Sequence, residues 1–379
     1  MNPAGLYLHI PFCKTKCHYC DFYSDTNMSW KNDFVKALTN EMKMESGFLN
    51  DIKPAIRTIY FGGGTPSLLD ENDFSKIFSA ISENFDISMC NEITLEANPD
   101  DLSIEYLEML RRFPFNRISI GVQSLNDNEL IAINRRHNSE QARKAVTVCK
   151  EAGFENISID LMYGLPGQSI ESFGRTIDMA MKLPVKHISS YALSWEEGSV
   201  LYSKLLKGEL KQASDEFLET CYFQLNSILM SRDFLRYELS NFSIPGYESK
   251  HNSSYWDGTY YLGLGPGAHS YNGIVRRVNI SSVGKYISGV SSGEPVRETE
   301  LLDLNDKYND FIMTRIRTTG GVLMQELENL FGISKRYYCM SNARKSLRNG
   351  LLIYENNCLK LDVKGLFVAD SVCSDLIWA

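Results

Sequence analysis

The chain has 379 residues, and its 39 basic and 47 acidic side chains leave a formal net charge of −8, which argues against a dedicated nucleic-acid-binding protein. Hydrophobic residues make up 43% and charged residues 23%, as in ordinary globular proteins, so a disordered or fibrous chain is excluded. At roughly 150 residues per domain, the length predicts about two to three domains, or one large barrel with an appendage.

In the first half of the chain, short β-branched runs alternate with amphipathic stretches, which predicts six βα units. The expected strands are 6–10, 56–61, 92–97, 117–122, 156–162 and 187–193. A helix is expected after Asp70, because its side chain suits a helix start. Alternation of this kind predicts a parallel sheet covered by helices.

Glycine and polar residues follow several of these strands, where the βα loops of a barrel build active sites. They are Gly62, Gly63, Gly64, Thr65, Glu96, Gln123 and Asp160. The placement favours an α/β fold, a partial (β/α)6 barrel over residues 1–213. A plainer alternative is that Glu96 and Asp160 are helix caps or loop residues.

The pattern changes at Ser214, where a long helix is expected to begin. An aromatic and Gly-rich loop over 236–271 is expected after it, followed from Asp303 by three short helical patterns and a hairpin. The domains expected here are a connecting helix with an aromatic and Gly-rich loop, 214–302, and a small C-terminal α+β domain that resembles a winged helix, 303–379.

Three of the nine cysteines, Cys13, Cys17 and Cys20, crowd into a Cys-x3-Cys-x2-Cys loop after the first expected strand, and the other six scatter. Three thiolates are able to hold three irons of a [4Fe-4S] cluster and leave the fourth iron open to an external ligand. A Cys3His zinc site with His18 is the competing interpretation, although compact zinc sites usually draw on separated ligand pairs. Three incidental cysteines are the plainest alternative.

The cysteine spacing resembles that of the radical S-adenosylmethionine superfamily, in which the open iron binds the amino and carboxylate groups of S-adenosylmethionine. Residue types elsewhere in the barrel suit this cofactor. Glycines 62–64 let the backbone approach an amino acid moiety, Glu96 suits an ammonium or ribose hydroxyls, and Arg135 suits a carboxylate. Gln123 and Asp160 suit the ribose or the adenine edge.

Five stretches carry a closer resemblance. They are Tyr7-Leu8-His9-Ile10-Pro11-Phe12-Cys13, Tyr60-Phe61-Gly62-Gly63-Gly64-Thr65-Pro66-Ser67, Glu96-Ala97-Asn98-Pro99, Gly121-Val122-Gln123-Ser124 and Asp160-Leu161-Met162-Tyr163-Gly164-Leu165-Pro166-Gly167-Gln168. Over nearly the whole chain the sequence resembles the HemN/HemW group of radical S-adenosylmethionine proteins, which contains an oxygen-independent coproporphyrinogen III dehydrogenase and a heme chaperone. The resemblance implies a [4Fe-4S] cluster on the three clustered cysteines. The positions that it implies around S-adenosylmethionine are Tyr7, Tyr19, Gly63, Gly64, Thr65, Glu96, Gln123, Arg135, Asp160 and Ala192.

Two departures favour the chaperone branch of this group. The dehydrogenase branch has a further cysteine two residues after the third cluster ligand, where this chain has Phe22. It also carries an N-terminal extension, which the 12 residues before Cys13 do not supply.

The stretch His251-Asn252-Ser253-Ser254-Tyr255-Trp256 resembles a His-Asn-x-x-Tyr-Trp motif associated with heme binding in this group. The resemblance implies heme binding by His251, Asn252, Tyr255 and Trp256. A neutral imidazole is able to ligate heme iron, and aromatic faces suit a porphyrin. The plainer alternative is that His251 caps a turn and the aromatics close the barrel, and His269 is a second, weaker candidate ligand.

We therefore predict a heme chaperone that binds heme and transfers it to an acceptor protein. A reductant for its cluster is a further expected partner, and a homodimer is one of the oligomeric states that the sequence leaves open. The alternative is a coproporphyrinogen III dehydrogenase that uses S-adenosylmethionine for oxidative decarboxylation. A cytoplasmic protein is expected, since no stretch approaches the roughly 18 apolar residues of a membrane span and no signal peptide is evident. A basic cluster in the C-terminal region is interpreted as a solvated helix face rather than a nucleic-acid site. Its members are Lys335, Arg336, Arg344, Lys345 and Arg348.

Overall fold

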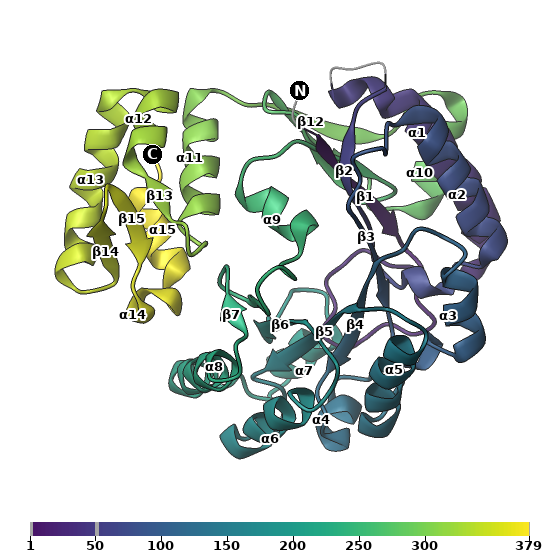
Figure 1. Ribbon diagram of the computed structural model, residues 1–379, viewed down its shortest axis with the longest axis horizontal. Coiled ribbons are helices and arrows are strands. Elements are labelled where there is room, and N and C mark those ends of the chain that lie inside the picture. The colour runs from purple at the N-terminus through teal and green to yellow at the C-terminus, as the bar shows by residue number, and fades with distance from the viewer. Residues whose placement is uncertain (1–2, 50–52, 379) are drawn as a thin grey trace.

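The computed structural model describes residues 3–49 and 53–378, and its central feature is one large curved sheet (Figure 1). The strands lie in the order β12-β11-β10-β9-β1-β2-β3-β4-β5-β6-β8-β7. The six middle strands from β1 to β6 are parallel and follow one another in chain order. They are β1 (Ala4–Ile10), β2 (Ile56–Gly63), β3 (Glu92–Ala97), β4 (Arg117–Gln123), β5 (Asn156–Tyr163) and β6 (His187–Ala192). All six expected strands are confirmed, and with them the α/β fold.

Helices cover the outer, convex side of this sheet (Figure 1). In the first part of the chain the helices are α1 (Lys31–Glu45), α2 (Glu71–Asn84), α3 (Ile104–Leu110), α4 (Asp127–Ala132), α5 (Ser139–Glu151), α6 (Ile170–Ala180), α7 (Val200–Leu206) and α8 (Asp215–Met230). Asp70 caps α2 as expected and forms a capping box with Asp73. Ser214 likewise caps the long helix α8, because its side chain accepts a hydrogen bond from Phe217 N.

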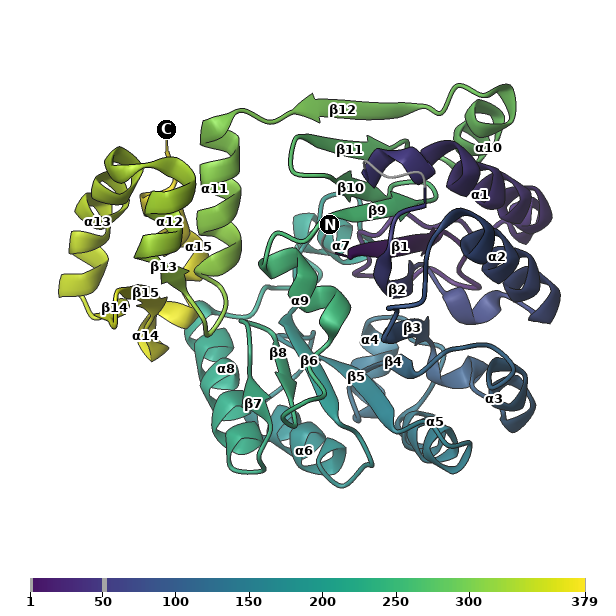
Figure 2. The same ribbon diagram turned by 45° about the horizontal axis from the view of Figure 1, so that its top comes forward.

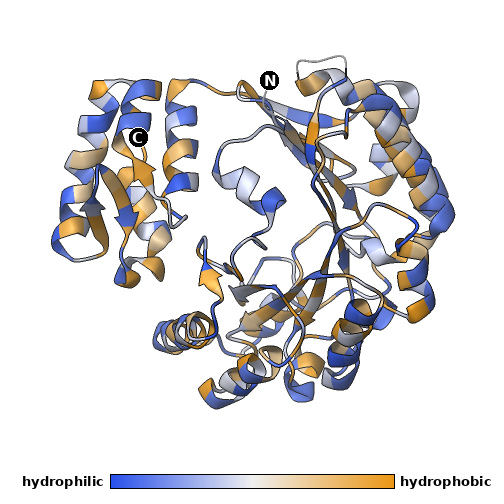
Figure 3. Ribbon diagram, viewed as in Figure 1, coloured by the Kyte–Doolittle hydropathy of each residue, from blue (hydrophilic) through white to orange (hydrophobic). Residues whose placement is uncertain are grey.

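The hydropathy of the outer helices matches this packing. Hydrophobic residues recur along the parallel strands, whereas the outer helices carry both hydrophobic and hydrophilic residues (Figure 3). Large side chains such as Phe61, Phe74 and Phe173 are fully buried between sheet and helices. Burial of an amphipathic face in this way supplies most of the stability of such helices.

The expected loop over 236–271 is wrong, because this segment is largely structured. After β7 (Leu235–Arg236) it contains β8 (Asn241–Ser243), α9 (Lys250–Trp256), β9 (Tyr261–Leu264) and β10 (His269–Tyr271). These elements have only three to seven residues, too few for a periodic pattern to be legible. Strand β9 pairs in parallel with β1, so the segment extends the barrel sheet, and α9 lies on the concave side of that sheet (Figure 2).

The sheet ends in antiparallel strands beyond β9. Strands β11 (Val275–Asn279) and β12 (Arg297–Leu301) flank the helix α10 (Val283–Ser292). Glu41 of α1 joins this extension to the barrel, since its buried carboxylate accepts hydrogen bonds from Gly265 N (2.8 Å), Asn279 Nδ2 (2.6 Å) and the Tyr286 hydroxyl (2.6 Å). The extension is therefore anchored by polar contacts as well as by strand pairing.

The C-terminal region forms the small α+β domain that the sequence predicts. Its elements are α11 (Leu304–Arg315), β13 (Val322–Leu323), α12 (Met324–Phe331), α13 (Ile333–Arg348), β14 (Leu352–Glu355), β15 (Cys358–Leu361), α14 (Val363–Leu366) and α15 (Ala369–Leu376). The hairpin β14–β15 turns at Asn356 and Asn357, whose φ angles of 51° and 61° are those that a two-residue hairpin turn requires.

One residue of the expected basic helix face faces inward. Lys335 on α13 is only 6% exposed, and its ammonium lies 3.3 Å from the ring centroid of Trp378. Arg336 beside it pairs with Glu328 at 2.6 Å. The interpretation as a wholly solvated basic face is therefore wrong for Lys335, which belongs to the domain core.

Within residues 3–49 and 53–378, no helix has the length and apolar character that crossing a bilayer requires. All nine cysteines are free.

Candidate functional site

The cysteine loop begins where β1 ends and returns to the same place. The backbone of Cys13 donates to Asp25 O (3.0 Å), and the backbone of Asp25 donates to Pro11 O (2.6 Å). These two bonds close the base of the loop that carries Cys13, Cys17 and Cys20, at the end of β1. All three thiols are partly exposed.

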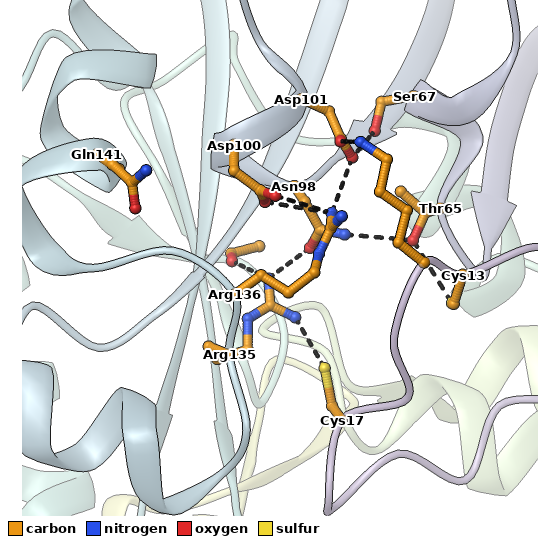
Figure 4. A network of polar contacts seen from close by, with 12 residues as sticks. Cys13, Cys17, Thr65, Ser67, Asn98, Asp100, Asp101, Arg135, Arg136 and Gln141 are labelled. Atoms are coloured by element: carbon orange, nitrogen blue, oxygen red, sulfur yellow. Dashed lines mark hydrogen bonds and ion pairs between the residues drawn. The ribbon is translucent and has the colours of Figure 1, made fainter. Parts of the chain in front are cut away.

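Two side chains from neighbouring loops donate hydrogen bonds to the cysteine sulfurs (Figure 4). Thr65 Oγ1, after β2, donates to Cys13 Sγ at 3.5 Å, and Arg135 Nη1, after β4, donates to Cys17 Sγ at 3.2 Å. Donors to sulfur stabilise thiolates that carry negative charge, which is the form that ligates iron. The three cysteines and their donors therefore fit an iron-sulfur cluster.

The zinc alternative has no support in the described part of the chain. No three His, Cys, Asp or Glu side chains there come close enough together to hold a single metal ion. A [4Fe-4S] cluster offers a separate iron to each of three thiolates, so their sulfurs need not converge on one point. A Cys3His site with His18 is therefore not assembled among the described residues.

The glycine run after β2 packs against the cysteine loop backbone to backbone. Gly64 N donates to Ile10 O at 2.8 Å, and a Cβ at Gly64 would lie 2.7 Å from Phe12 O. Gly63 has a φ of 106°, and a Cβ there would meet the His9 ring at 2.6 Å. A Cβ at Gly64 would push the two loops apart. A Cβ at Gly63 would clash with the His9 ring, and the φ of Gly63 lies in the region that favours glycine, so glycine is required at both positions.

Glu96 on β3 faces the inside of the barrel. Its carboxylate accepts the Tyr60 hydroxyl at 2.6 Å and Gly63 N at 3.2 Å. Burial, together with the nearby Asp160 charge, raises the pKa of Glu96 to about 7, although these two hydrogen bonds oppose the rise. Burial also raises the pKa of Asp160, whose Oδ1 lies 3.4 Å from Ser119 Oγ.

Arg135 is held by three bonds and keeps one donor free. Besides Cys17, its guanidinium binds Asn98 Oδ1 at 2.5 Å and Gly121 O at 2.6 Å through Nη2. Its Nε is buried and has no hydrogen-bond partner among the described residues. A buried unpaired donor calls for an acceptor, and a bound carboxylate would supply one. Together with Gly63, Gly64 and the inward-facing Glu96, the free Nε of Arg135 fits S-adenosylmethionine.

The remaining positions expected around S-adenosylmethionine lie on the same strands or on the cysteine loop. The Tyr7 hydroxyl lies 3.1 Å from His9 Nδ1, and Gln123 ends β4 with a φ of 66°. Tyr19, from the cysteine loop, packs against a small apolar cluster that includes Leu193, the residue after Ala192. Ala192 is the exposed end of β6.

Arg117 is a site residue that the sequence prediction missed. It begins β4, is 1% exposed, and its Nε and Nη1 have no hydrogen-bond partner among the described residues. Its charge lowers the pKa of both Glu96 and Asp160. The signal available in the sequence was its register, because Arg117, Ser119 and Gly121 alternate with the apolar residues of that strand.

His251 lies in helix α9 and not in a turn, and its ring is enclosed by the barrel. Its imidazole is 1% exposed, with Nδ1 2.9 Å from Thr58 Oγ1 and Nε2 2.9 Å from the Tyr255 hydroxyl. The Tyr60 ring stacks on it with 5.0 Å between centroids. Burial, with the charge of Arg117, lowers the pKa of His251 to about 3, so the ring is neutral.

A buried carboxylate holds α9 in this position. Glu92, at the start of β3 and 2% exposed, accepts hydrogen bonds from Lys250 N (2.9 Å) and His251 N (2.8 Å). These are backbone donors of the first turn of α9, where a negative charge is favourable. The sequence prediction missed Glu92 as well.

The other three residues expected to bind heme, Asn252, Tyr255 and Trp256, line a cavity next to α9. The cavity has a volume of about 280 Å³, and its lining includes Asn252, Tyr255, Trp256, Tyr191 and Arg317. Ligand pockets typically measure about 300–1,000 Å³, so a porphyrin does not fit this cavity as it stands. His251 has no free ring nitrogen directed into it, because Thr58 and Tyr255 engage both nitrogens. His269 lies apart from α9, exposed on β10.

Two family models match the chain. The model described as the radical SAM superfamily matches residues 7–180, and the model described as the HemN C-terminal domain matches residues 302–368.

Similar proteins cover nearly all of the chain. It is 34% identical over 372 residues to a protein of Lactococcus lactis named heme chaperone HemW, a match that covers 98% of this chain and 96% of that protein. It is 35% identical over 373 residues to a Bacillus subtilis protein of the same name, covering 97% of each. Among solved structures, coproporphyrinogen III oxidase (HemN) from Escherichia coli is similar with a TM-score of 0.85 at 21% identity, covering 99% of this chain and 90% of that one. The last likeness shows the fold.

Proposed function

The chain belongs to the HemW family of radical S-adenosylmethionine proteins, and on that premise we propose that it is a heme chaperone, which binds heme and passes it to an acceptor protein. The observation that carries the proposal is identity above 30% to proteins of that name over nearly the full length of both chains. The likeness to coproporphyrinogen III oxidase is one of fold.

The family implies a [4Fe-4S] cluster and S-adenosylmethionine, which together supply one-electron chemistry when bound. We propose Cys13, Cys17 and Cys20 as the cluster ligands. Arg135 would offer its free Nε to the carboxylate of S-adenosylmethionine, and Glu96 would accept from its ammonium or ribose hydroxyls. The other residues proposed around this cofactor are Tyr7, Tyr19, Gly63, Gly64, Thr65, Gln123, Asp160 and Ala192.

We propose that heme binds at the α9 face, through His251, Asn252, Tyr255 and Trp256. Support comes from the neutral state of His251, which is the form that ligates metal, and from the aromatic side chains beside the cavity. Arg317 at the same cavity suits a propionate carboxylate. Because both nitrogens of His251 are hydrogen-bonded, ligation by this residue requires that the bond to Thr58 or to Tyr255 be lost.

The test is a heme titration of anaerobically reconstituted protein, followed by absorption spectroscopy. Wild type is expected to show a saturable Soret shift that His251→Ala weakens or alters. His187→Ala is a matched control, since His187 is also buried and its ring also lies between two hydroxyls, of Ser158 (2.7 Å) and Tyr237 (2.8 Å).

Two results would contradict the proposal. One is a wild-type protein with a full cluster that shows no saturable heme spectrum. The other is anaerobic turnover of coproporphyrinogen III to a decarboxylated porphyrinogen, which would favour the dehydrogenase instead.

A further inference from the structure

The carboxylate of Asp101 is buried beside the cysteine loop and accepts three hydrogen bonds (Figure 4). Asp101 ends the 3-10 turn after β3, and its side chain is only 3% exposed. Lys14 Nζ donates to Oδ1 at 2.7 Å, while Ser67 Oγ (3.0 Å) and Arg136 Nη2 (3.1 Å) both donate to Oδ2. The three donors come from three different connecting segments, those after β1, after β2 and between α4 and α5.

Each of these loops also carries part of the cysteine site. Lys14 directly follows Cys13 within the cysteine loop. Ser67 lies two residues after Thr65, which donates to Cys13 Sγ, and Arg136 follows Arg135, which donates to Cys17 Sγ. Asn98, from the same turn as Asp101, links the two sulfur donors, since it donates to Thr65 Oγ1 (3.2 Å) and accepts from Arg135 Nη2 (2.5 Å).

We propose that Asp101 is a positioning residue for the iron-sulfur cluster, because its carboxylate holds the cysteine loop in place together with the two segments whose side chains donate to the cluster sulfurs. Hydrogen bonds to the sulfurs and local net charge are two of the factors that set the potential of an iron-sulfur cluster. Loss of groups that orient metal ligands typically costs 10–100-fold in metal affinity. Asp101 therefore controls both how firmly the cluster is retained and how easily it is reduced.

The charge of Asp101 also has a defined sign. Lys14 and Arg136 place two positive charges beside the cysteine loop, and Asp101 contacts both of them at close range. If Asp101 is neutralised without a change in shape, these two cations are less fully compensated. The reduced cluster carries the extra electron, so its stability relative to the oxidised cluster is expected to increase.

The neighbouring Asp100 provides a matched control. It carries the same charge and pairs with Arg136 at 3.2 Å, but it has no bond to Lys14 or Ser67 and its side chain is 19% exposed. Asp100→Asn thus removes the same charge from the same turn and leaves the links to the cysteine loop and the glycine loop intact.

The experiment compares wild type, Asp101→Asn and Asp100→Asn after anaerobic reconstitution. The readouts are the reduction potential, from a redox titration followed by electron paramagnetic resonance, and the rate of cluster loss to an iron chelator. For Asp101→Asn we expect a more positive potential and cluster loss at least about tenfold faster. For Asp100→Asn we expect a shift in potential less than about half as large and a rate of loss close to wild type.

Equal effects of the two substitutions would overturn the proposal, since a general loss of charge would then suffice. So would an Asp101→Asn protein whose potential and cluster loss match wild type. If Asp101→Asn does not fold, Lys14→Met removes one of the three donors from a side chain that is 53% exposed. Several-fold faster cluster loss in Lys14→Met with unchanged circular dichroism supports the proposal, and a wild-type rate overturns it.

Discussion

Thr58→Val is the substitution that tests most directly the proposal that heme binds at α9. Thr58 on β2 is buried, and its hydroxyl lies 2.9 Å from His251 Nδ1. Valine keeps the shape of threonine and removes only the hydrogen-bonding group. The His251 ring would then be buried with one nitrogen that has no hydrogen-bond partner. The position of α9 in which this ring is buried would lose stability.

The magnitude follows from the cost of an unpaired buried polar group, which is about 1–3 kcal/mol. At 1.4 kcal/mol per factor of ten, this cost should raise the population in which the ring is released by about five- to 140-fold. If heme takes the released form of His251, the apparent dissociation constant for heme should fall by a similar factor, as long as that form remains a minority. Tyr255→Phe, which removes the hydroxyl beside Nε2, should act in the same direction.

Two assays measure this effect. Heme titration gives the dissociation constant, and hydrogen exchange of the α9 amides in heme-free protein reports release of the helix itself. Ser158→Ala is the control, because Ser158 Oγ on β5 makes the equivalent bond to the buried His187 on β6 at 2.7 Å, and neither residue contacts His251 by a hydrogen bond. It should leave heme affinity unchanged.

The reasoning would be refuted if Thr58→Val accelerated exchange in α9 but left heme affinity unchanged or weakened it. Heme would then bind without release of His251. A failure of wild type to bind heme would instead remove the proposed function itself.

Three other predictions concern pH, the cofactor site and Gly64. Burial raises the pKa of Glu41 to about 7 from an ordinary 4.5, so between these values the folded state retains a proton that the unfolded chain releases. The free energy of unfolding should therefore fall by on the order of 1–3 kcal/mol as pH rises from about 5 to about 8. Glu41→Gln should flatten the dependence of Tm on pH. The pKa of Glu96 is also raised to about 7, and its ionised form is the better acceptor, so the affinity for S-adenosylmethionine, measured by anaerobic calorimetry, should increase as pH rises through that value. The Glu96→Gln protein should bind S-adenosylmethionine about tenfold more weakly at high pH, and its affinity should not depend on pH in this range. Gly64→Ala should lower the iron content after reconstitution without a change in circular dichroism, because its Cβ would meet Phe12 O at 2.7 Å. Gly47→Ala places its Cβ in open space and should match wild type. Equal iron contents in the two variants would contradict the close packing of Gly64 against the cysteine loop.

The parallel strands could be predicted from local sequence because each is a short stretch in which apolar, often β-branched or aromatic, residues recur. The cysteine spacing is equally local, since three ligands within eight residues necessarily lie on one loop. Glycines after β2 and the Asn356-Asn357 turn also carry their conformations in the residue type itself. These features needed no knowledge of distant contacts.

Helix α9 could not be predicted from the local sequence. A stretch of seven residues has too few turns for an amphipathic pattern, and its first-turn amides are satisfied by Glu92, which lies 159 positions earlier in the chain than His251. The motif could be recognised in the sequence, but the burial of His251 between Thr58 and Tyr255 depends on the barrel that surrounds it.

The sequence by itself determined the α/β class, the six parallel strands, the cysteine loop and the family to which the chain belongs, because these depend on neighbouring residues and on whole-chain similarity. Only the tertiary structure decided which side chains meet inside the barrel. Arg117, Asp101 and Glu92 read as ordinary charged residues along the chain, yet each is buried where parallel strands bring distant segments together. A buried charge must find its partners or its ligand in three dimensions, and no sequence spacing specifies them.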